Sequence, residues 1–170
     1  MSKEKNISLT NKKFDTKKSI KRARRKKSER TPVWTISVDK HTYEWQSKYD
    51  RIAIIRKGLP YTTIEVISKQ SSLPVSKILT FLGVPQTTYN KNKRNKTLMS
   101  GRNSEAILLM VEVLEYGNLV FNSETDKFNR WLKKTNISIG NVTPESLFDT
   151  LSGIQVVRNC LNRIEYGSFA

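Results

Sequence analysis

The spacing of apolar residues predicts a chain built mainly of helices. Over 75–82, Val75, Ile78, Leu79 and Leu82 recur three and four residues apart, which places them on one stripe of a helix. Similar patterns and stop signals such as Gly58-Leu59-Pro60 predict further helices. These are expected from Asp50 to the glycine at 58, around Ile64 and Ile67, over 86–94, 104–121, 123–133 and 144–149, and from about Ser152 to Gly167. The fold class expected is all-α.

The segment before these helices has a different pattern. Residues 33–38 alternate weakly between apolar and polar, which permits a short strand. The nearby aromatic residues fit either stacking on bases or, as the favoured interpretation, anchoring of this segment to the globular part: Trp34, Tyr43, Trp45 and Tyr49.

Residues 75–94 have the size and punctuation of a helix-turn-helix. A short amphipathic helix ends at Gly83, and a second, polar helix begins at Pro85. Leu79 and Pro85 depart from the usual pattern, which has a small residue at the first position and a Ser or Thr cap at the second. The alternative is a plain helical hairpin with a basic face. If the unit binds DNA, base contacts are expected from Gln86, Thr87, Asn90 and Lys91, and phosphate contacts from Lys93, Arg94 and Lys96.

Charge favours DNA binding. The chain carries a formal net charge of +16. Residues 1–30 hold thirteen basic and three acidic side chains, and residues 61–100 hold six and one. Such a basic balance indicates a polyanionic partner. Residues 1–30 contain few apolar residues, so we expect a disordered arm that adds salt-dependent DNA affinity or only solubility.

The sequence offers no catalytic or metal site. One Cys and one His exclude the usual zinc sites, and no phosphate-binding glycine motif occurs among the seven glycines. Cys160 is expected to be buried, His41 to lie on the surface, and Glu112 and Glu115 to line a solvated helix edge. We therefore expect no enzyme and no cofactor. The absence of a long apolar run and of a signal peptide predicts a soluble, cytoplasmic protein with no membrane contact.

The C-terminal motifs resemble a known family. They are Phe128-Asn129-Arg130-Trp131-Leu132, Thr143-Pro144-Glu145-Ser146-Leu147-Phe148-Asp149-Thr150, Gly153-Ile154-Gln155-Val156-Val157-Arg158, and a last segment that runs from Leu161 to Ala170 with Arg163-Ile164-Glu165-Tyr166-Gly167 at its centre. In this order they are similar to the toxin-binding domain of the Xre/MbcA/ParS-type antitoxins. Upstream, the helix-turn-helix lies where that family has its Xre-like domain.

The resemblance implies an antitoxin of a type II toxin-antitoxin system. Its relatives neutralise RES-domain toxins, which consume NAD or transfer ADP-ribose, and bind operon DNA as dimers or toxin–antitoxin assemblies. We expect four segments: the basic arm over 1–30, a lead-in segment over 31–60, a helix-turn-helix domain with dimerisation helices over 61–121 and a toxin-binding domain over 122–170. The resemblance implies the last two, whereas the first 50 residues depart from the family pattern and the arm is longer and more charged than the resemblance predicts. Residues that carry over as toxin contacts are Arg158, Arg163, Glu165, Tyr166, Gly167 and Phe169.

Two alternatives remain open. The protein could be a stand-alone helix-turn-helix regulator that has kept the fold without a toxin partner. It could also bind nucleic acid through the basic arm without regard to sequence.

Overall fold

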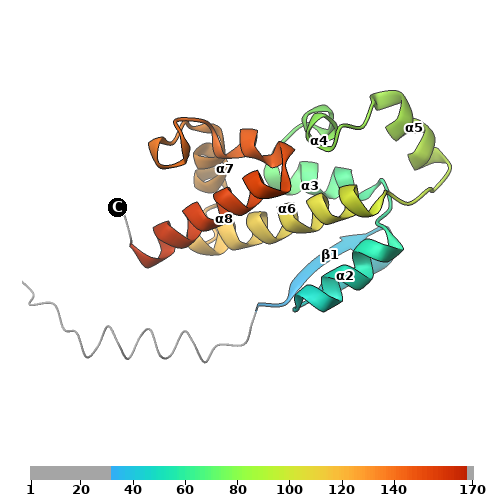
Figure 1. The fold of residues 1–170 in the computed structure, drawn as a ribbon, viewed down its shortest axis with the longest axis horizontal. Helices are drawn as coiled ribbons and strands as arrows, with labels where there is room; N and C mark the ends of the chain where they lie inside the picture. The colour runs from blue at the N-terminus through green and yellow to red at the C-terminus, as the bar shows by residue number, and fades with distance from the viewer. Residues whose placement is uncertain (1–31, 168–170) are drawn as a thin grey trace, which may run out of the picture. The chain divides into compact units, whose positions relative to one another are not determined.

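The folded chain is mostly helical, with a short β-hairpin ahead of the helices (Figure 1). A computed structural model describes residues 32–167, so the predicted arm over 1–30 and Phe169 lie outside the described residues. The elements are β1 (Trp34–Val38), β2 (His41–Trp45), α2 (Lys48–Lys57), α3 (Thr63–Ser71), α4 (Val75–Leu82), α5 (Gln86–Arg94), α6 (Gly101–Val120), α7 (Thr125–Lys133), the 3₁₀ helices η1 (Ile137–Ile139) and η2 (Pro144–Asp149), and α8 (Leu151–Tyr166). The helices expected from the apolar spacing are all present.

The segment expected as a lead-in folds into the hairpin and α2. The strands pair antiparallel, from Trp34 opposite Trp45 to Val38 opposite His41. A two-residue turn joins them, in which Asp39 adopts a left-handed conformation (φ 55°) that a short polar side chain tolerates. The alternation noticed over 33–38 marks one buried face of β1, whereas the pairing with β2 depends on the turn.

The aromatic residues of this segment divide into anchors and a surface residue. Trp34 and Trp45 are buried and Tyr43 is half-buried, which confirms the anchoring interpretation for these three. Tyr49 is 83% exposed, so that interpretation is wrong for it. Tyr49 lies in the first turn of α2, which begins after the N-cap Ser47 and has no buried residue.

Helix α6 is the centre around which the other elements pack. It contacts β1, α2, α3, α7 and α8, and α8 runs along it (Figure 1). Ile107, Leu108, Val111 and Leu114 are almost completely buried there. A helix that is apolar on nearly all sides, as α6 is in its middle, needs cover on all sides. Within residues 32–167, no helix combines the length and hydropathy required to span a bilayer.

A glycine allows α7 to approach α6 closely. A Cβ placed on Gly117 would lie 2.2 Å from the ring of Phe128, a buried residue of α7. The Phe128 ring also lies near Phe121 and Trp131, with centroids 5.6 and 6.0 Å away. The missing side chain at Gly117 therefore makes room for an aromatic cluster that joins the two helices.

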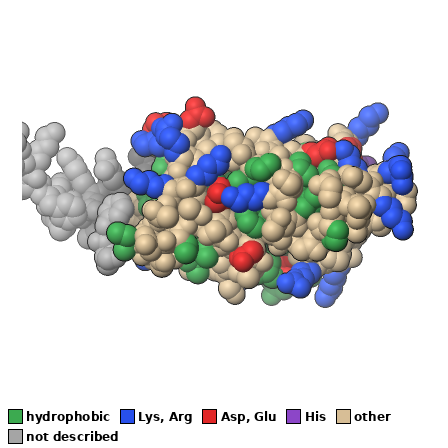
Figure 2. All heavy atoms as spheres, turned by 90° about the horizontal axis from the view of Figure 1, so that it is seen from above, with side chains coloured by type: hydrophobic (Ala, Val, Ile, Leu, Met, Phe, Trp, Pro, Cys, Tyr) green, Lys and Arg blue, Asp and Glu red, His purple; other side chains and the backbone are tan. Residues whose placement is uncertain are grey.

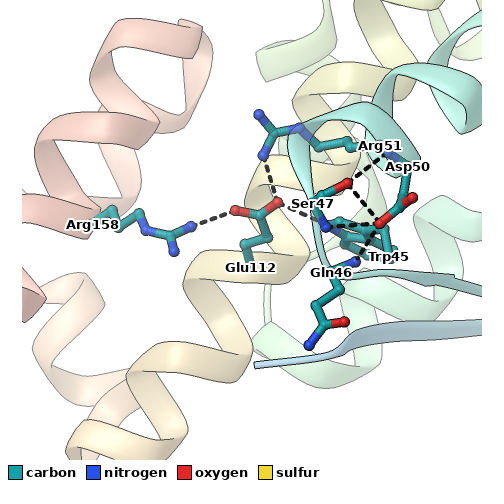
Figure 3. Close-up of polar contacts among 7 residues, drawn as sticks. All are labelled: Trp45, Gln46, Ser47, Asp50, Arg51, Glu112 and Arg158. Carbon is teal, nitrogen blue, oxygen red and sulfur yellow. Dashed lines mark hydrogen bonds and ion pairs between the residues drawn. The ribbon is translucent and has the colours of Figure 1, made fainter. Parts of the chain in front are cut away.

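The buried carboxylate of Glu112 joins four elements (Figure 3). Its Oε1 accepts hydrogen bonds from Trp45 Nε1 of β2 at 2.9 Å and from Arg51 of α2 at 2.6 Å. Its Oε2 accepts from Arg158 of α8. The guanidinium group of Arg158 also lies 5.5 Å from the centroid of the Trp34 ring. The carboxylate thus has three donors from three elements.

The predicted solvated helix edge is wrong for Glu112, which is 4% exposed. Burial of a carboxylate is costly unless it is paired and hydrogen-bonded, and here two arginines and an indole N–H meet that condition. Glu115 is half-buried, and burial raises the pKa of its carboxyl group, while a hydrogen bond from the Thr35 backbone acts in the opposite direction.

The substitution Glu112→Gln tests this junction. The amide keeps the size of the side chain but leaves Arg51 and Arg158 without their shared charge. We expect the free energy of unfolding to fall by about 2 to 4 kcal/mol. This loss is smaller than for a fully buried ion pair, because both arginines still reach water. Urea denaturation measures it.

Glu105→Gln is the matched control on the same helix, where the side chain is half-buried. We expect it to change stability by about 0.5 kcal/mol or less. Equal losses in the two variants would show that the Glu112 contacts add nothing.

Candidate functional site

The helix-turn-helix consists of α4, a glycine turn and α5. Gly83 adopts a left-handed conformation (φ 62°), and its N–H and that of Val84 reach the carbonyls of Thr80 and Leu79 at 3.1 and 2.9 Å. These bonds end α4 in a way that glycine favours. Pro85 follows as the N-cap of α5, with no side-chain cap bond. Leu79 and Pro85, which depart from the usual helix-turn-helix pattern, are both accommodated in this geometry. Leu79 is buried in the core.

Tyr89 fixes the orientation of α5 against the rest of the fold. Its ring is buried, with the Tyr61 ring centroid 6.3 Å away. Its hydroxyl donates to Glu65 Oε1 of α3 at 3.0 Å, and Lys93 forms an ion pair with the same oxygen. Burial, followed by this hydrogen bond, raises the pKa of Tyr89 to about 12. Chiefly through the bond from Lys93, the pKa of Glu65 falls below its usual value.

Most of the residues predicted to contact DNA lie on the outer side of α5. Gln86 Nε2 donates to Asn90 Oδ1 at 3.0 Å, one helical turn away, so the two side chains form one polar unit on the surface. Lys93 instead points toward Glu65. Figure 2 shows Lys and Arg side chains gathered at the end of the molecule that carries α5. The exposed members of the predicted set are Gln86, Thr87, Asn90, Lys91, Arg94 and Lys96.

The predicted partner contacts of α8 divide into anchored and outer residues. Arg158 binds Glu112 and lies 5.9 Å from the Tyr116 ring centroid. Glu165 accepts a hydrogen bond from the Tyr116 hydroxyl, which also lies 2.6 Å from Asn162 Oδ1. Burial, followed by the bond to Glu165, raises the pKa of Tyr116. These bonds fix the last turns of α8 on α6.

The end of α8 is on the surface. Tyr166 is 68% exposed, and Gly167 ends the helix in a left-handed conformation (φ 66°). Arg163 is half-buried beside them. Apolar residues of the family motifs in this domain are packed inside it or at its edge: Trp131, Leu132, Pro144, Leu147 and Phe148. Cys160 is buried, as predicted.

The residues that hold these surfaces in place have no recognisable local pattern in the sequence. Glu65 and Glu112 bind partners that lie 24 to 67 positions away in the chain. Lys40 and His41 lie beside α5 only because the hairpin folds there. No local pattern identifies such pairs, although an acidic residue among apolar neighbours, as at 112, is a usable signal.

Comparison with known proteins agrees with the two-part organisation. The model of the antitoxin Xre-like helix-turn-helix domain matches residues 50–112, and that of the antitoxin Xre/MbcA/ParS C-terminal toxin-binding domain matches residues 117–167. The chain is 34% identical over 115 residues to Antitoxin Xre of Photorhabdus laumondii, covering 68% of this chain and 78% of that protein.

Two further relatives are similar at lower identity. The Prs ADP-ribosylating antitoxin of Sphingobium sp. is 29% identical over 132 residues, which are 73% of this chain and 83% of the relative. Antitoxin Xre of Yersinia enterocolitica is 25% identical over 116 residues, 68% and 78% of the two chains. The matched domains, their order along the chain and these relatives show that the chain belongs to the Xre/MbcA/ParS family of antitoxins, with a helix-turn-helix domain followed by a C-terminal toxin-binding domain.

Proposed function

We propose that this antitoxin neutralises a RES-domain toxin by placing the C-terminal end of α8 at the active-site cleft of the toxin, and that it represses its own operon through α5. The observation that carries the proposal is the form of α8. Arg158 in its body and Glu165 in its last turn are bonded to α6, and the last turn also presents the exposed Tyr166 and a glycine cap.

A rigid helix with an exposed end suits insertion into a cleft. The bonds of Arg158 and Glu165 to α6 order the helix before binding, which reduces the entropy lost on association. Tyr166 supplies an aromatic ring of the type that dominates binding energies at interfaces. The proposed contacts are Arg158, Arg163, Glu165, Tyr166, Gly167 and Phe169, the last of which lies outside the described residues.

The chemistry of the proposed toxin involves NAD or ADP-ribose. The resemblance of the C-terminal motifs to antitoxins that bind RES-domain toxins supports this choice. The name of the Sphingobium relative, Prs ADP-ribosylating antitoxin, also connects that protein with ADP-ribosylation. The chain itself carries no proposed catalytic residue or cofactor.

The exposed polar face of α5 supports DNA reading. Gln and Asn side chains can bond bidentately to adenine, and lysine reaches the acceptors of guanine. Tyr89 and Glu65 hold the opposite face, so these side chains are presented on a fixed helix. We assign DNA binding and dimer formation to residues 61–121 and toxin binding to 122–170, in a homodimer or a higher toxin–antitoxin assembly located in the cytoplasm.

Base reading by α5 is tested with Gln86→Ala and Asn90→Ala. Each is expected to weaken binding to the operon promoter by about 1 to 3 kcal/mol for a lost base contact, and binding to a shuffled duplex much less. Fluorescence anisotropy on both duplexes measures the difference.

A matched pair on α8 provides the control. Gln155 and Asn159 form the same four-residue Gln–Asn bond at 3.0 Å on an exposed surface. Gln155→Ala and Asn159→Ala are expected to leave promoter binding unchanged. If the α5 variants bind both duplexes more weakly by the same factor, α5 does not read the bases.

Toxin neutralisation is tested by truncation. A chain ending at Ile164 is expected to fold but to leave the product of the neighbouring gene toxic, because the exposed end of α8 is gone. Growth and cellular NAD, measured during co-expression, report neutralisation, and thermal unfolding checks the fold. Because this truncation also removes Glu165, which binds Tyr116, Tyr166→Ala serves as a gentler variant.

Deletion of residues 1–30 is the control and is expected to leave neutralisation intact. A chain ending at Ile164 that still restores growth and NAD would exclude the role proposed for the C-terminal end. A full chain that binds its promoter but forms no complex with the neighbouring gene product would instead be a stand-alone regulator.

A further inference from the structure

The turn of the β-hairpin presents basic groups beside the C-terminal end of α5. Lys40 lies in the turn and His41 begins β2, and both side chains are exposed. In Figure 1, β1 runs toward the end of the molecule where α5 lies. The hairpin precedes both matched family domains, which begin at residues 50 and 117. The hairpin therefore lies outside both matched ranges.

The turn is held in a fixed position relative to the helix-turn-helix. Thr62, the N-cap of α3, donates from its hydroxyl to Asp39 Oδ2 at 3.0 Å. The inner face of β1 is closed by Ile36 and Val38, which are 1% and 2% exposed. A turn tied at its tip and along its inner face keeps its outer side chains at a constant place beside α5.

One cavity is lined by both the hairpin turn and the end of α5. Lys40 and His41 line it from the hairpin, and Lys93 and Lys96 line it from the other side. Lys93 is paired with Glu65. Among residues 32–167, no carboxylate lies within ion-pair distance of Lys40 or Lys96. Asp39 is the one acidic residue that lines the cavity, and it accepts the hydrogen bond from Thr62. The two lysines therefore remain available for an outside anion.

We propose that this turn is a second contact to the DNA backbone, in which Lys40 and His41 bind a phosphate next to the one that Lys96 reaches. The inference rests on the proposed reading of DNA by α5. A helix lying in the major groove brings its C-terminal end close to a phosphate strand, so a basic group fixed beside that end meets the same strand. Such a contact positions the protein and adds affinity but does not read the sequence.

The test is Lys40→Gln in the full chain, alone and with His41→Gln. Binding is measured by fluorescence anisotropy to a promoter duplex and to a shuffled duplex of the same composition, over a range of salt concentrations. We expect both duplexes to be bound more weakly by the same factor. The slope of log affinity against log salt is expected to fall by about 0.9 for the lost phosphate contact.

Two further variants serve as a negative and a positive control. Lys134→Gln, at the end of α7, removes the same charge from an exposed position away from α5 and is expected to change neither affinity nor slope. Lys96→Gln is expected to show the same signature as Lys40→Gln. If Lys40→Gln behaves like Lys134→Gln, the proposed contact is overturned.

Asn90→Ala and Lys40→Gln together distinguish failure of the hairpin contact from failure of base reading by α5. If Asn90→Ala lowers discrimination between the duplexes and Lys40→Gln changes nothing, only the hairpin contact fails. If Asn90→Ala does not affect discrimination, the reading by α5 fails, whatever Lys40 does. Hydroxyl-radical footprinting gives an independent measurement, because loss of the contact should expose a short stretch of backbone that the unaltered protein protects.

Discussion

The fold depends on the buried carboxylate of Glu112. Its oxygens accept from β2, α2 and α8, and its backbone belongs to α6, so a single side chain ties together elements that are far apart in sequence. Moving a carboxylate out of water costs several kcal/mol, and hydrogen bonds from two arginines and an indole offset that cost. Because its three donors come from β2, α2 and α8, the carboxylate favours the packing of the hairpin and α8 in which all three reach it.

This junction joins the two matched family domains. Glu112 is the last residue of the range matched by the helix-turn-helix domain, and Arg158 lies in the range of the toxin-binding domain. Arg158 also stacks near Trp34 of the hairpin. Arg158, one of the six residues that the family resemblance carries over as toxin contacts, is therefore also part of the internal structure. A substitution there alters packing together with any contact to a partner.

The carboxylate of Glu65 orients α5 in a similar way. Glu65 accepts from Tyr89 and Lys93, which turns one face of α5 inward and leaves Gln86, Asn90 and Lys91 outward. The end of α5 and the end of α8 lie at opposite ends of the folded part of the chain (Figure 1). Glu65 lies behind the exposed face of α5, and the bond from Tyr116 to Glu165 holds the end of α8 on α6. Both surfaces are therefore polar and exposed while keeping their orientation.

The sequence by itself determined the helices, because they are set by local rules: the apolar stripe of Val75, Ile78, Leu79 and Leu82 and the glycine ends at Gly83 and Gly167. Its motifs also determined the family. Only the tertiary structure decided the pairing of β2 with β1, the burial of Glu112, the inward direction of Lys93 and the place of Lys40 beside α5. Each of these depends on contacts between distant parts of the chain, and the side chain's own neighbours in sequence carry no information about such partners.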